Sequence, residues 1–165
     1  MKKTLLVGAI AFICVGANAA YTFPENAVTS EKNRIVSLES LNYKIDLDEK
    51  KTMDELRLCL AELIDNDNDF IKAETDSAII VKGSIRIDKN SWGNDELVNY
   101  ELKALNNSDM LKLKYYNLGF GYIKPNQNPE DVKVRKPATH FGGGGKETID
   151  EVSKLHQNIK DCIEF

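Results

Sequence analysis

Residues 70–122, FIKAETDSAIIVKGSIRIDKNSWGNDELVNYELKALNNSDMLKLKYYNLGFGY, decide the fold of this chain. Short runs in which apolar and polar side chains alternate are separated by segments rich in Asp, Asn, Ser and Gly. This period of two predicts strands at about 70–75, 78–88, 96–105 and 110–122, joined as an antiparallel meander. The alternation also predicts one dry and one wet face, so we expect the rest of the chain to cover the dry face.

The segment before this meander contains a strand and a helix. We expect a strand over Arg34–Asp48, with a bend or bulge near Ser40 where the phase of the apolar residues changes. Thr52 and Glu55 have the spacing of a capping box and predict that a helix begins there and runs to Ile64. Residues 20–33 show no clean period, and we expect them to be an N-terminal lead whose ordering is optional.

The segment after the meander is irregular and then helical. The apolar phase shifts between Tyr115 and Tyr116, which predicts a bulge in the last strand. Residues 124–145 carry three prolines and four consecutive glycines, so we expect a linker without regular structure. A second helix is predicted from about Glu147 to Ile163, with Thr148 and Glu151 as its capping box.

The predicted order is β-α-β-β-β-β-α, and each helix has a single apolar stripe. Because each strand also has one apolar face, both helices should pack on the same side of the sheet. The sequence therefore predicts an α+β fold, a two-layer sandwich of a curved antiparallel sheet with two helices on one face.

The first residues have the features of a secretory signal peptide. Lys2 and Lys3 precede an apolar run over 5–15, which is too short to span a bilayer comfortably, and residues 17–19 read Ala-Asn-Ala. We expect cleavage before Ala20 and a single domain over 20–165, either periplasmic or secreted. Cys14 is not expected to be lipidated, because a bulky Ile13 stands where a lipobox has a small residue.

The charge of the chain argues against a general affinity for nucleic acid or anionic lipid. The whole chain has a net charge of −4, and loss of Lys2 and Lys3 with the leader makes it −6. No second apolar run could span a membrane.

Two cysteines, Cys59 and Cys162, remain after the leader. An even count in an oxidising compartment favours a disulfide between them. Two buried free thiols, or one intermolecular bridge, are the alternatives.

One acidic stretch partly matches a calcium loop. Asp65, Asp67 and Asp69 fall at positions 1, 3 and 5, and Asp76 falls at position 12. Position 6, however, is Phe70 in place of glycine, and a strand follows in place of a helix. The pattern favours a solvated acidic turn, with calcium as the alternative.

No other motif points to catalysis or to a cofactor. The chain has two histidines, and neither belongs to a His-x-x-x-His or Cys-x-x-Cys zinc pattern. There is no Gly-x-Ser-x-Gly elbow for a nucleophilic serine. We therefore predict no catalytic residue and no cofactor.

Two regions are candidates for contact with a partner. Trp92 lies at a predicted hairpin tip, and Phe120 and Tyr122 lie at the aromatic end of the last strand. The wet face of the sheet should carry mixed charge with an excess of lysine, which is typical of a solvated face or of a surface for an acidic partner. Its charged residues would be Lys44, Lys82, Arg86, Glu101, Lys103, Lys112 and Lys114.

The order of the elements resembles a family of secreted bacterial domains of unknown function with a TATA-binding-protein-like fold. The match consists of a leader, a strand ending near Asp48, the helix Thr52–Ile64, four strands, a long linker and the helix Thr148–Ile163. The resemblance implies the fold and no activity. Related folds of helices on a curved sheet bind ligands between helix and sheet, which is an analogy of fold alone.

We expect an exported, non-enzymatic binding domain for a protein or an apolar ligand of the cell envelope. Two alternatives remain open. The chain could be a periplasmic immunity-type inhibitor of a toxin, which its small size and acidity would suit. It could also be a hydrolase whose site the sequence does not reveal.

Overall fold

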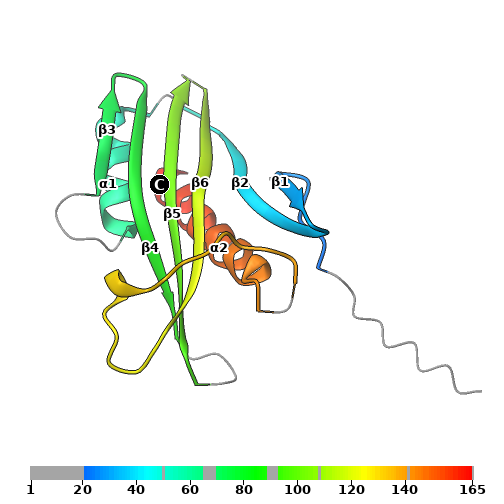
Figure 1. Cartoon of the computed structure of the whole chain (residues 1–165). Coiled ribbons are helices and arrows are strands. Elements are labelled where there is room, and N and C mark those ends of the chain that lie inside the picture. Colours follow the sequence, from blue (N-terminus) through cyan, green and yellow to red (C-terminus); the bar gives the residue numbers. More distant parts are fainter. Residues whose placement is uncertain are drawn as a thin grey trace, which may run out of the picture.

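The computed structural model describes residues 21–49, 51–64, 70–88, 93–107, 109–140 and 142–164. Six strands form one antiparallel sheet in the order β1-β2-β6-β5-β4-β3 (Figure 1). In chain order the elements are β1 (Ala27–Lys32), β2 (Ile35–Asp46), α1 (Met53–Leu63), β3 (Ile71–Thr75), β4 (Ala78–Ile87), β5 (Asp95–Asn107), β6 (Met110–Ile123), a short 3-10 helix η1 (Pro129–Asp131) and α2 (Gly145–Glu164).

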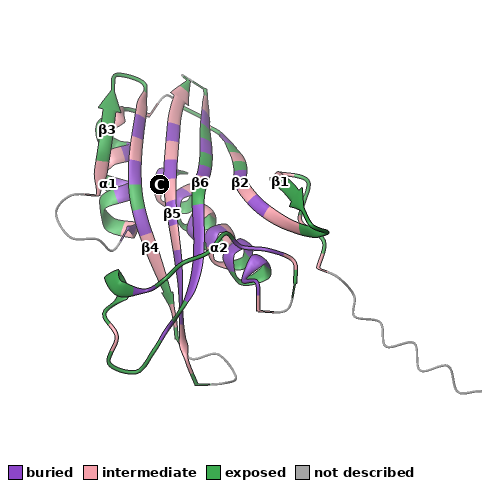
Figure 2. Cartoon of the chain, viewed as in Figure 1, coloured by how far each residue is buried: buried purple, intermediate pink, exposed green. Residues whose placement is uncertain are grey.

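Both helices pack on the same face of the sheet, as predicted, and the α+β two-layer fold is confirmed (Figure 1). Burial alternates along the strands, as the sequence period requires (Figure 2). In β6, Leu111, Leu113 and Tyr115 are buried toward the helices, whereas Lys112 and Lys114 are exposed on the opposite face. We call that opposite face of the sheet the outer face.

Part of the lead over 20–33 is an ordered strand that the sequence did not predict, because β1 forms a hairpin with β2. Asn33 and Arg34 make its turn, with φ values of 54° and 64°, as in the two-residue turns that match strand twist. Most of β1 is exposed at the sheet edge, so it lacks the apolar alternation that marks a buried strand. The predicted irregularity near Ser40 is confirmed, since the register shifts between the pairs Val28↔Ser40 and Thr29↔Leu38.

The predicted bulge in the last strand is also present, slightly later than expected. The β5–β6 register shifts between the pairs Glu101↔Tyr116 and Asn99↔Gly119, so two residues of β6 face one residue of β5. Asn117 adopts φ 50° at this point, as the first residue of one bulge class does. The extra residue returns the aromatic end of β6 to the face that the helices cover.

The segment predicted as an irregular linker is in large part bound to the sheet. The β2–β6 pairing stops at Ser40↔Tyr116, and the chain enters the gap beyond it. Arg135 and Phe120 exchange both backbone hydrogen bonds, at 2.8 and 2.9 Å. On the other side, Leu38 N donates to the Pro137 carbonyl at 2.8 Å. The linker therefore fills the space where β2 and β6 separate.

The same linker covers one end of the outer face (Figure 1). Val132 packs on Gly121 and Val134 on Gly119 so closely that an added Cβ would lie 2.7 and 2.9 Å from their methyl carbons. Leu97, Ile123 and Val132 form a small separate buried cluster there. Within the described ranges, the outer face is thus divided into a half covered by the linker and a half at the other end of the strands that no other segment covers, which we call the bare half.

The start of α2 differs from the prediction. The helix begins at Gly145, and Thr148 lies inside its first turn, with its amide donating to the Gly144 carbonyl at 3.0 Å. The predicted capping box of Thr148 and Glu151 is therefore wrong, because the glycines let the chain enter the helix earlier. The box at α1 is confirmed: Thr52 Oγ1 accepts from Glu55 N at 3.2 Å, and Glu55 Oε2 accepts from Thr52 N at 2.6 Å.

No helix in the part of the chain that the structure describes has the length and apolar character needed to cross a bilayer. The leader predicted over 1–19 lies outside the described residues.

Candidate functional site

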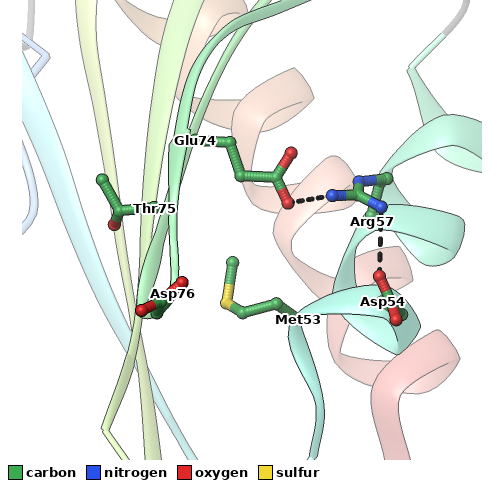
Figure 3. A pocket seen from close by; sticks show the side chains of 6 residues that line it. All are labelled: Met53, Asp54, Arg57, Glu74, Thr75 and Asp76. Carbon is green, nitrogen blue, oxygen red and sulfur yellow. Dashed lines mark hydrogen bonds and ion pairs between the residues drawn. The ribbon is translucent and has the colours of Figure 1, made fainter.

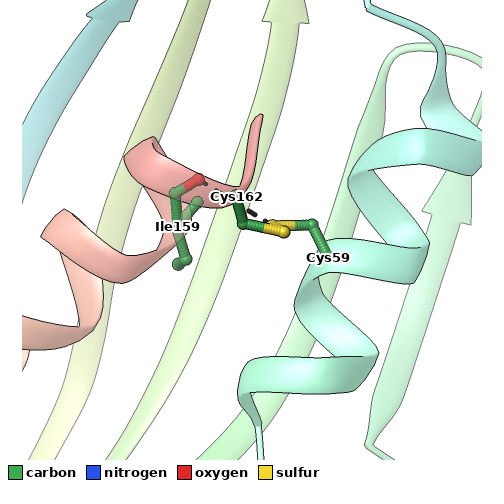
Figure 4. Close-up of a disulfide and its surroundings, with 3 residues drawn as sticks. All are labelled: Cys59, Ile159 and Cys162. Carbon is green, nitrogen blue, oxygen red and sulfur yellow. Dashed lines mark hydrogen bonds between the residues drawn. A yellow bond between two sulfur atoms is a disulfide. The ribbon is translucent and has the colours of Figure 1, made fainter. Parts of the chain in front are cut away.

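Cys59 of α1 and Cys162 of α2 form a disulfide, with their Cα atoms 6.0 Å apart (Figure 4). The bond joins the two helices directly and closes a segment with a sequence separation of 103. The Cys59 sulfur also lies 3.8 Å from the Ile159 carbonyl oxygen. Because a disulfide sulfur has no proton to donate, this is a packing contact.

A groove of about 360 Å³ runs beside the disulfide. Its lining residues are Glu49, Lys51, Glu55, Leu58, Cys59, Glu62, Cys162 and Ile163. Among the described lining residues Lys51 is the only cation and is paired with Glu49 at 2.9 Å, so these residues together are negatively charged. Negative side chains around a disulfide repel an attacking thiolate. This environment is therefore typical of a structural disulfide and not of one that takes part in thiol–disulfide exchange.

A second, wider cleft of about 560 Å³ lies between α1 and the β3–β4 turn (Figure 3). Arg57 points across it and pairs with Glu74 of β3, while its other nitrogen donates to Asp54 at 3.0 Å. The remaining lining residues are Met53, Thr75 and Asp76. Arg57, the one cation among the described lining residues, is therefore already neutralised by two carboxylates.

The cleft contains the one described member of the predicted calcium set, Asp76, which is exposed at the β3–β4 turn. Asp65, Asp67 and Asp69 lie outside the described residues, so calcium binding stays the alternative to the predicted solvated turn. Within the described ranges, no group of three or more His, Cys, Asp or Glu residues could hold a metal ion.

The predicted aromatic contact residues have different environments. Phe120 is 1% exposed and packs beneath Gly144, so its ring belongs to the core. Tyr122 is 37% exposed and meets Phe120 edge-on, with ring centroids 5.3 Å apart. Burial, followed by the carboxylate of Glu96, raises the pKa of Tyr122. Trp92 lies outside the described residues and stays a prediction.

The bare half of the outer face carries lysines as direct cross-strand neighbours. The register places Lys103 of β5 opposite Lys114 of β6, and Lys112 of β6 opposite Lys44 of β2. Side chains in such positions have Cβ atoms about 4.5–5.5 Å apart, and like charges there are destabilising. Among the described residues, none of these four lysines has an ion-pair partner. We call Lys44, Lys103, Lys112 and Lys114 the lysine patch.

Apolar side chains lie between and beside the lysines of the patch, and one carboxylate, Asp46, borders it on β2. Ile80 is opposite Lys103, Leu105 is opposite Lys112, and Met110 is opposite Asp46; all three apolar residues are half-buried. At the border, Glu101 pairs with Lys72 and accepts from Asn117 at 3.1 Å. The carboxylate that borders the patch on the linker side is therefore already paired, and the four lysines outnumber Asp46, so the patch has a net positive charge.

His156 of α2 and Tyr43 of β2 stack between helix and sheet, with ring centroids 4.1 Å apart and an interplanar angle of 22°. The Tyr43 hydroxyl is 2.9 Å from Ser153 Oγ. His156 Nδ1 is buried without a hydrogen-bond partner within the described chain. Burial lowers the pKa of His156 below its usual 6.5, and the nearby Lys160 ammonium lowers it further.

We expect the free energy of unfolding to fall as the pH drops below about 6.5, because the unfolded chain then binds a proton at His156 that the folded chain resists. Glu39, Glu55 and Glu101 also have lowered pKa values, but their effect begins only near pH 4.5. Urea unfolding between pH 8 and 5 measures this. His156→Phe keeps the stacking and should remove the fall, whereas His140→Gln, at an exposed position, should retain it. If the free energy of unfolding of His156→Phe falls with pH as that of the wild type does, another group causes the fall.

Sequence reasoning identified the lysines of the wet face but not their pairing. Which lysine stands opposite which depends on the register of three strands, and the bulge at Asn117 limits where that register holds. The signal available in the sequence was the Lys-x-Lys spacing of residues 112 and 114 on a strand with a buried opposite face.

No family model matches the chain, and no curated protein resembles it in sequence. Two solved structures are similar in fold. A TBP-like protein from Parabacteroides distasonis has a TM-score of 0.57 and 11% identity, over 81% of this chain and 96% of that one. A DUF4468 family protein from Bacteroides ovatus has a TM-score of 0.53 and 11% identity, over 85% and 94%. With its antiparallel sheet and two helices on one face, the chain has the TATA-binding-protein-like fold found in these bacterial proteins.

Proposed function

We propose that this chain is a non-enzymatic binding domain whose partner covers the bare half of the outer face. One observation carries the proposal: the linker seals one half of this face with valines on glycines, while the other half keeps Ile80, Leu105 and Met110 half-exposed among lysines. A mixed apolar and charged surface of this kind fits a protein better than an apolar small molecule.

The proposed location is the periplasm or the exterior of the cell. The leader pattern of residues 1–19 supports export. The disulfide supports an oxidising compartment, because such bonds are rare where thiols are kept reduced. An inhibitor of a secreted toxin is one special case of this proposal, and a toxin gene next to this one would favour it.

A photo-crosslinking amino acid at position 105 tests the proposal in living cells. Leu105 lies on β5 in the bare half of the outer face, so illumination should give one adduct of defined mass. The same probe at Gln157, exposed on α2, is the control and should give none. No adduct at position 105, or equal adducts at both positions, would contradict a partner on this face.

A further inference from the structure

We propose that the lysine patch docks an acidic protein segment, in which carboxylates alternate with apolar side chains. This inference rests on the proposed function and names the chemistry of its partner. Lys103 and Lys114 are one cross-strand pair, and Lys112 and Lys44 are the next, so four ammonium groups share a small area. Along β6, Lys112 and Lys114 are about 7 Å apart, the repeat of one face of a strand.

The patch differs from six other described lysines, each of which has an acid as its ion-pair partner. Lys136 pairs with Glu39 at 2.8 Å, Lys51 with Glu49 at 2.9 Å, and Lys72 with Glu101. On α2, each of three lysines has an acid three or four residues away: Lys146–Asp150, Lys154–Glu151 and Lys160–Glu164. In the lysine patch, each lysine instead has a second lysine as its direct neighbour. Since that arrangement costs stability in the free protein, a partner that supplies carboxylates removes the cost on binding.

The remaining surface of the molecule favours an acidic segment over an extended polyanion. The helix layer on the other side of the sheet carries the acids of α1 and α2, and the chain without its leader has a net charge of −6. A membrane surface or a nucleic acid would feel that net repulsion over about a Debye length. A short segment that contacts only the patch would not. The apolar side chains of Ile80, Leu105 and Met110 between the lysines would meet the apolar residues of the same segment.

The first test needs no partner. Lys103→Gln removes one charge of a cross-strand pair, so its thermal midpoint should rise by a few degrees in 20 mM NaCl and should match the wild type in 500 mM NaCl. Lys32→Gln changes the same net charge at an exposed lysine at the end of β1 and should leave the midpoint unchanged. If the thermal midpoints of the two variants change equally with salt, the lysines of the patch do not repel one another measurably. That result would overturn the inference.

The second test measures binding of a defined probe to the purified chain. The probe is a capped 12-residue peptide that alternates Glu and Val, and its twin carries Gln in place of Glu. We expect the Glu peptide to bind with an affinity that falls at least tenfold between 20 and 300 mM NaCl, and the Gln peptide not to bind. Lys103→Gln/Lys114→Gln should weaken binding at least tenfold, whereas the control pair Lys32→Gln/Lys124→Gln should change it less than twofold.

The outcomes separate this inference from the proposed function. If the adduct at position 105 still forms in cells with Lys103→Gln/Lys114→Gln, a partner does bind the outer face. The same result would contradict the inference that this partner is acidic. Tighter binding to phosphatidylglycerol vesicles than to the Glu peptide would also overturn it, in favour of a membrane surface. Binding of both peptides alike would mean that carboxylates are not recognised.

Discussion

Reduction of the Cys59–Cys162 disulfide is expected to lower the free energy of unfolding by about 4–5 kcal/mol, a large part of the stability of a typical domain. The bond closes a loop with a separation of 103 residues, so in the chain-entropy model the unfolded chain gains considerable freedom when it is cut. The bond also ties the two helices of the helix layer to each other, because it joins α1 to α2.

Chemical denaturation of the same wild-type protein, oxidised and fully reduced, measures this change without altering any side chain. Cys59→Ala/Cys162→Ala should be as destabilised as the reduced protein or slightly more so, since Cys59 is buried and its sulfur leaves a small void. Cys162→Ala alone, at the less buried partner, separates loss of the bond from loss of the buried sulfur. Oxidised and reduced protein that unfold within about 1 kcal/mol of each other would contradict the expected role of the bond.

Gly144→Ala is expected to destabilise the fold by about 2–5 kcal/mol, the sum of a backbone term and a packing term. Gly144 has φ +72°, where a side chain costs about 1–2 kcal/mol. A Cβ at this position would also lie 2.0 Å from Cγ of Phe120, which is buried and cannot easily move. The added methyl therefore forces either the aromatic ring or the start of α2 away from the sheet.

Gly93→Ala is the matched control for this substitution. Gly93 has a similar positive φ, +79°, but no described residue lies within 4 Å of an added Cβ. Its loss should be only the backbone term of about 1–2 kcal/mol. The double variant Gly144→Ala/Phe120→Leu should recover part of the packing term. Equal losses for Gly144→Ala and Gly93→Ala would show that the contact with Phe120 has no energetic effect.

The helices and strands could be predicted from the sequence wherever one of their faces is buried, because burial makes apolar residues recur at the spacing of that element. Alternation placed β4, β5 and β6 within two residues of their observed ends, and the capping box placed the start of α1 at Thr52. The two cysteines could be assigned to the helix stripes for the same reason. The edge strand β1 escaped detection because most of its side chains face water and carry no apolar pattern.

The candidate binding surface could be predicted only in composition. Lysines at alternate positions of a strand must share a face, so residues 112 and 114 were placed correctly on the wet side. That Lys103 meets Lys114, and Lys112 meets Lys44, required the register of neighbouring strands. The linker was even less predictable, because its hydrogen bonds with Phe120 and Leu38 depend on the gap between β2 and β6.

The sequence by itself determined the helices, the four long strands and the dry face that unites them, because each depends on side chains within one segment. Only the tertiary structure decided which half of the outer face stays bare and which charges meet there. The physical reason is the same for both, because each depends on contacts between separate segments. Pairing between strands brings the charges together. The covered half is set by the contacts of Val132 with Gly121 and of Val134 with Gly119.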